Sequence, residues 1–92
     1  MIGQRIKELR EFKGLSRREL ERLTGIPDYK WVSIETERQQ TNGEHIAALA
    51  KIWPEYKHWI VFGETIPEVG QISPELEETR EKLAKAGGSP NG

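Results

Sequence analysis

Residues 15–38, LSRRELERLTGIPDYKWVSIETER, predict two short helices joined by a tight glycine turn. Ser16 and Glu19 have the spacing of a capping box, in which the hydroxyl accepts from a first-turn N–H and the carboxylate accepts from the backbone N–H of the cap. A helix is therefore expected to begin at Arg17. Gly25 ends it, because a left-handed backbone conformation is least costly for glycine.

The second helix of the pair has one face suited to packing and one with nothing to bury it. Pro27 fits a helix start, and Asp28 is either the N-cap or a first-turn acid favoured by the helix dipole. The packing face carries Trp31, Ile34 and Glu35 at spacings of three and four residues. The opposite face carries mixed polar and small side chains, which are Tyr29, Val32, Ser33 and Thr36.

Two short helices around a glycine turn are typical of the helix-turn-helix, in which the second helix enters a DNA major groove. Residues 2–63 also resemble the lambda-repressor-like, or XRE, helix-turn-helix family of phage repressors and bacterial regulators. The resemblance rests on the segments IGQRIKELREFKGLS, REL, TGI, SIE and WIVFG. It implies an all-α fold with a lambda-repressor-like five-helix DNA-binding domain. Glu21 departs from the pattern, since the family usually has a small residue at that helix contact.

Three other helices complete the predicted domain of residues 1–63. Residues 1–13 carry an apolar stripe that is expected to cover the helix-turn-helix. Thr41 and Glu44 repeat the capping-box spacing and are expected to open the fourth helix. A short fifth helix is predicted over residues 56–62.

The chain continues beyond this domain with a connection, a sixth helix and a tail. Residues 64–72 contain proline, glycine and spaced apolar side chains, which favours an extended strap lying against the domain. Residues 73–86 predict an additional C-terminal helix with a thin apolar stripe and acid–base pairs four residues apart. This helix either docks on its own domain, joins two subunits or frays. Residues 87–92 are expected to be disordered.

Composition limits the classes of function. Ninety-two residues suggest one small domain, and the absence of cysteine excludes disulfides, thiolate zinc sites and a catalytic thiol. His45 and His58 have no partner at ligand spacing, so we expect surface histidines and neither metal nor cofactor. No acid–base pair, nucleophile or phosphate-binding glycine loop indicates an enzyme. Without a long apolar run or signal peptide pattern, the chain is expected in the cytoplasm.

Charge is distributed unevenly although the formal net charge is only −1. Residues 1–42 carry nine Lys and Arg against seven Asp and Glu, whereas residues 43–92 carry five against eight. The first half is mildly basic and the second acidic, as expected if one side meets phosphate.

The DNA contacts divide into base readers and phosphate contacts. Candidate base readers at the exposed start of the second helix are Asp28, Tyr29, Val32 and Ser33, and the resemblance points to the first, second and fourth of these. Val32 suits a thymine methyl, and Asp28 suits a cytosine amino group if it is not simply a cap. Candidate phosphate contacts are Arg17, Lys30, Arg38, Gln39, Gln40 and Thr41. The resemblance also implies a partly buried ion pair between Arg10 and Glu35; the alternative is a solvated arginine.

A single unit offers little contact area, so we expect a homodimer on double-stranded DNA with an inverted-repeat operator. The predicted dimer surface is Pro54, Tyr56, His58 and Trp59, with the strap or the sixth helix, although Trp53 and Trp59 fit the core equally well. The expected function is transcriptional regulation by a phage or prophage repressor. One alternative is an antitoxin that neutralises a toxin and autoregulates its operon, and a second is an adaptor that binds only protein. A protein inducer is a further possible partner.

Overall fold

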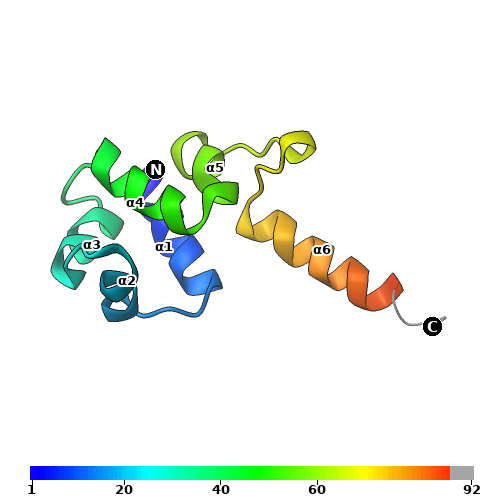
Figure 1. Cartoon of the computed structure of the whole chain (residues 1–92), viewed down its shortest axis with the longest axis horizontal. Helices are drawn as coiled ribbons and strands as arrows, with labels where there is room; N and C mark the ends of the chain where they lie inside the picture. The colour runs from blue at the N-terminus through cyan, green and yellow to red at the C-terminus, as the bar shows by residue number, and fades with distance from the viewer. Residues whose placement is uncertain (88–92) are drawn as a thin grey trace.

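The computed structural model describes residues 1–87, which form six α-helices and two short 3₁₀ helices (Figure 1). The α-helices are α1 (Ile2–Phe12), α2 (Arg17–Thr24), α3 (Asp28–Glu35), α4 (Gly43–Ile52), α5 (Lys57–Phe62) and α6 (Pro74–Gly87). The 3₁₀ helices are η1 (Pro54–Tyr56) and η2 (Pro67–Val69). The predicted all-α class is confirmed. Of the predicted disordered tail, residues 88–92 lie outside the described residues, and Gly87 ends α6.

One apolar core joins helices α1 to α5. Its members are Ile6, Leu9, Leu20, Trp31, Ile34, Leu49, Tyr56, Trp59 and Ile60. The side chains of Trp31 and Ile34 of α3 have no exposed surface. Truncation of a buried tryptophan to alanine typically costs about 3–5 kcal/mol. These two residues therefore hold an eight-residue helix that is too short to be stable alone in water.

The turn between α2 and α3 forms as the sequence predicts. The Ser16 hydroxyl accepts from the Glu19 N–H at 3.1 Å, and the Glu19 carboxylate accepts from the Ser16 N–H at 2.8 Å. The latter hydrogen bond lowers the pKa of the Glu19 carboxyl. Gly25 ends α2 in the left-handed conformation, with φ of 77°. Leu23, three residues after the buried Leu20, is 51% exposed at the end of the helix.

The predicted capping box at the start of α4 is wrong by one residue. Asn42, and not Thr41, is the N-cap, and its side-chain oxygen accepts from the His45 N–H at 3.0 Å. In return the Asn42 N–H donates to Nδ1 of His45 at 3.2 Å. Asparagine is at least as good an N-cap as threonine. His45 is the third residue of α4, the position at which the prediction had placed Glu44. The predicted capping box therefore began one residue too early.

The prediction of a surface histidine is wrong for His45. Its side chain is buried, and its ring lies 6.0 Å from the Trp31 ring, centre to centre. Burial lowers the pKa of His45, because the charged imidazolium is poorly solvated there. His58 is half-buried, and its ring lies 4.8 Å from that of Phe62.

The segment of residues 64–72 is folded more tightly than the predicted extended strap. Ile66 and Gln71 form an isolated antiparallel bridge around η2. The Gln71 side chain accepts from the His58 N–H at 2.9 Å and donates to the Pro54 carbonyl at 3.0 Å. Its backbone hydrogen bonds close the bridge, so this segment forms a small hairpin-like turn fixed to α5 and η1.

The C-terminal helix α6 touches the domain at its beginning and then extends away from it (Figure 1). Ile72 packs against the core just before α6, and its N–H donates to the Glu55 carbonyl at 2.8 Å. Glu77 of α6 lies 3.9 Å from the Lys13 ammonium at the end of α1. Further along, Leu83 is 66% exposed. The first turns of α6 therefore dock in cis, which was one of the alternatives left open by the sequence.

The buried side chain of His45 predicts that acid destabilises the fold. Because the pKa of His45 is lower in the folded state than its unfolded value of about 6.5, the unfolded chain binds more protons in the interval between the two values. The free energy of unfolding is therefore expected to fall as pH drops below about 6.5. Melting temperatures measured from pH 8 to pH 5 test this. His45→Gln, which keeps a capping-box residue, should flatten the dependence of melting temperature on pH, and the control His58→Gln should not. Equal pH dependence in the two variants would contradict the assignment of the acid sensitivity to His45.

Candidate nucleic-acid interface

A buried carboxylate, that of Glu35 at the end of α3, binds two arginines from two other helices. Arg10 of α1 donates through Nε and Nη2 to the two carboxylate oxygens at 2.8 and 3.0 Å. Arg17 of α2 donates through Nε to one of them at 3.0 Å. The Glu35 side chain has no exposed surface. The ion pair of Arg10 and Glu35 is thus present where the resemblance implied it, and the solvated-arginine alternative is wrong.

The two arginines differ in which of their guanidinium N–H groups remain without a hydrogen-bond partner. Arg10 is buried, and its third nitrogen donates to the Leu15 carbonyl at 2.7 Å. Its hydrogen bond to Glu35 raises the pKa of Arg10, although burial opposes this. The Arg17 side chain is 33% exposed, and within residues 1–87 only its Nε has a hydrogen-bond partner. Glu35 therefore fixes Arg17 by one edge, and its terminal amino groups remain available to a second anion.

The start of α3 resolves the two alternatives for Asp28. Pro27 is the N-cap and Asp28 is the first residue of the helix, where an acid is favoured by the helix dipole. The N–H of Asp28 donates to the carboxylate of Glu21 at 3.0 Å. Glu21, the residue that departs from the family pattern, thus caps α3 from the preceding helix. Sequence reasoning missed this contact, because it joins residues seven positions apart across the turn.

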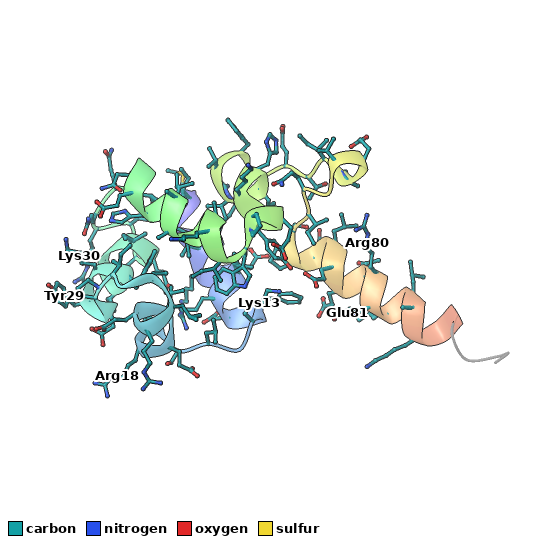
Figure 2. All side chains as sticks on the ribbon, viewed as in Figure 1. Lys13, Arg18, Tyr29, Lys30, Arg80 and Glu81 are labelled. Atoms are coloured by element: carbon teal, nitrogen blue, oxygen red, sulfur yellow. The ribbon has the colours of Figure 1, made fainter. Side chains whose placement is uncertain are left out.

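The outer face of α3 is exposed along most of its length. Tyr29 is 66% exposed and Val32 36% exposed, while Ser33 is half-buried. Figure 2 shows Tyr29 and Lys30 projecting from α3 at the end of the molecule farthest from α6, with Arg18 of α2 projecting nearby. The structure therefore brings the predicted base readers and Lys30 to one accessible surface.

The loop after α3 carries four of the predicted phosphate contacts. Glu37 has a left-handed conformation with φ of 62°, and its carboxylate accepts from the Gln4 N–H at 3.1 Å. The N–H groups of Arg38 and Gln39 both donate to the Ser33 carbonyl, at 2.9 and 3.1 Å. These bonds fix the loop to the end of α3. Of the predicted loop contacts, Arg38 and Gln40 are exposed, and Gln39 and Thr41 are half-buried.

The predicted dimer surface is wrong for its two largest members. Tyr56 has no exposed surface and Trp59 is 7% exposed, because both contribute to the core of their own chain. Pro54 is exposed and His58 is half-buried. Beside His58 lies Phe62, which is 63% exposed and was not singled out from the sequence. The hydrophobic WIVFG segment gave no signal of which of its aromatic residues faces outward.

Within residues 1–87, no group of three or more His, Cys, Asp or Glu side chains is arranged to hold a metal ion. Over the same residues, no helix combines the length and the apolar character needed to cross a membrane. The exposed face of α3 with its flanking cations is therefore the principal candidate site.

Comparison with known proteins relates the chain to a phage protein of solved structure. No protein-family model matches the chain, and no curated protein matches it. The solved structure of Pf6r, from the filamentous phage Pf6 of Pseudomonas aeruginosa PA01, matches with a TM-score of 0.65 and 30% sequence identity. The match covers 80% of this chain and 95% of the Pf6r chain. The chain belongs to the same family as Pf6r. A member of this family is therefore encoded by a filamentous phage.

The buried carboxylate predicts unequal effects for two neighbouring glutamates. Glu35→Ala leaves Arg10 buried without its partner, and breaking a buried pair in this way typically costs about 3–5 kcal/mol. Glu37→Ala removes one exposed hydrogen bond to the start of α1, so a smaller loss is expected. Chemical denaturation of both variants gives their free energies of unfolding. Equal losses of unfolding free energy in the two variants would show that the buried ion pair does not stabilise the packing of α3.

Proposed function

We propose that this chain is a sequence-specific DNA-binding regulator of transcription in a phage or prophage, acting as a repressor of the XRE type. The observation that carries the proposal is the exposed outer face of α3 bordered by cationic side chains. An α-helix fits the major groove of B-DNA, where base edges are distinguishable. Kinship with a filamentous phage protein supports a role in a phage.

Phosphate contacts supply most of the affinity in this proposal. Arg17 presents terminal amino groups that suit the oxygens of a phosphate, and Glu35 holds its Nε edge in place. A preoriented side chain loses less conformational freedom on binding. Lys30 on α3 and Arg38 in the loop after it are both exposed, and in this proposal both bind the phosphate backbone. Tyr29, Val32 and Ser33 then meet the base edges, and the partly buried Asp28 acts chiefly at the start of the helix.

A homodimer is part of the same proposal. One eight-residue helix contacts few base pairs, and a two-fold dimer doubles the contact with an inverted-repeat operator. With Tyr56 and Trp59 committed to the core, the accessible surface beside them is Pro54, His58 and Phe62. The exposed Phe62 ring adds an aromatic group to this surface, and aromatic residues are enriched in subunit interfaces.

A second candidate function is that of an antitoxin of the same fold. It is favoured by α6, which extends from the domain with Leu83 66% exposed and offers a helix to a protein partner (Figure 1). Copurification with the product of the neighbouring gene at defined stoichiometry would support it. A chain that shifts operator DNA by itself and retains no such partner would favour the repressor.

The proposal predicts salt-sensitive binding to DNA upstream of its own gene. Log affinity should fall with log salt, and each lost phosphate contact should lower the slope by about 0.9. In a dimer, Arg17→Ala and Lys30→Ala should each lower the slope by about 2, whereas the control Arg80→Ala on α6 should leave it unchanged. Gel shifts at several salt concentrations measure this. Footprinting should protect two half-sites about 34–36 Å apart.

Two results would contradict the proposal. Absence of a shift on every upstream fragment, with a folded protein, would favour a protein-binding role. Equal salt slopes for the Arg17→Ala, Lys30→Ala and Arg80→Ala variants would mean that DNA binds elsewhere on the chain.

A further inference from the structure

The outer face of α3 has an unusual balance of apolar and polar groups for a surface that reads bases. The residues at its centre, opposite the buried Trp31 and Ile34, are Tyr29, Ser33 and Thr36, with Val32 at one edge. No arginine, asparagine or glutamine lies on this face within α3. Those are the side chains that bind guanine or adenine through two hydrogen bonds. Direct reading of purines by this helix is therefore limited.

The hydroxyl of Thr36 is already occupied within the helix. It donates to the Val32 carbonyl at 2.7 Å, with a longer approach of 3.4 Å to the Ser33 carbonyl. A hydroxyl has one proton to donate. Thr36 is exposed, so what it can offer to an incoming base edge is its methyl group and the remaining acceptor capacity of its hydroxyl oxygen. Val32 presents two methyl groups and is 36% exposed.

Lys30, the one cation within α3, lies off the centre of this face. Successive residues of an α-helix are turned by about 100°, so Lys30 is displaced by that angle from Tyr29. Its side chain is exposed. Lys30 therefore lies at the rim of the face, where a phosphate contact is favoured over a base contact.

We propose that α3 recognises thymine through its 5-methyl group, and that Val32 and Thr36 are the specificity-determining residues. Thr36 lies on the outer face and Val32 at its edge, and thymine is the base that presents a methyl group in the major groove. The cations around this face match the charge of the DNA backbone, which commits the surface to duplex DNA. This inference rests on the proposed function and names the substrate class: operators with thymine in each half-site opposite α3.

The size of the effect follows from apolar burial. Removing one buried methyl from an apolar contact corresponds to about a fourfold loss of affinity. A symmetric operator contains each contact twice. Replacing the contacted thymine by deoxyuridine in both half-sites, which deletes only the 5-methyl group, should therefore weaken binding about fifteenfold.

The experiment uses the duplex that the full chain selects from a random-sequence library. Each thymine is replaced in turn by deoxyuridine, and binding is measured for the wild type, for Val32→Ala and for Thr36→Ser, which keeps the hydroxyl and removes the methyl. As a control, each guanine is replaced by 7-deazaguanine, which lacks the N7 acceptor. Melting temperatures confirm that both variants, changed at exposed positions, remain folded.

The wild type should lose affinity at one or two thymines in each half-site, and one of the two variants should be insensitive to the same replacement. Unchanged wild-type affinity with every thymine replaced would overturn the inference and leave DNA binding intact. Sensitivity that persists in both variants would overturn the assignment to Val32 and Thr36. If the chain selects no sequence from the library, both the proposed function and the inference about thymine are overturned.

Discussion

The carboxylate of Glu35 is the point at which three helices are fixed relative to one another. It lies at the end of α3, has no exposed surface, and accepts hydrogen bonds from Arg10 of α1 and Arg17 of α2. A buried ion pair adds little net stability compared with an apolar replacement, but loss of one partner is costly. Its main physical effect here is on geometry. Three hydrogen bonds from α1 and α2 to one carboxylate constrain the angle of α3 relative to those two helices.

The same contacts separate the two faces of α3. Trp31, Ile34 and Glu35 are used entirely within the molecule, and Tyr29, Val32 and Ser33 are left outside it. Each end of the helix is also fixed, by the Glu21 carboxylate at the beginning and by the loop N–H groups bound to the Ser33 carbonyl at the end. A short helix with both ends and one face fixed presents its remaining side chains in a rigid arrangement, as base recognition requires.

Sequence reasoning succeeded where the determinants are local. The Ser16–Glu19 capping box, the Gly25 turn and the packing face of Trp31 and Ile34 depend on residues within four positions of each other. It failed where two local solutions compete. Thr41–Glu44 and Asn42–His45 have the same spacing, and the burial of His45 beside Trp31 favours the second. Likewise, nothing local to Tyr56 and Trp59 shows that they turn inward while Phe62 turns outward.

We propose that the outer face of α3, with its flanking cations, is the surface that meets DNA. Amide chemical-shift changes in a ¹⁵N-labelled sample, recorded as a duplex carrying the selected site is added, locate that surface residue by residue. The largest changes are expected at the amides of residues 28–33 and 38–43 and at Arg17, with α6 unaffected. Changes confined to α5 and α6, with α3 unmoved, would contradict it.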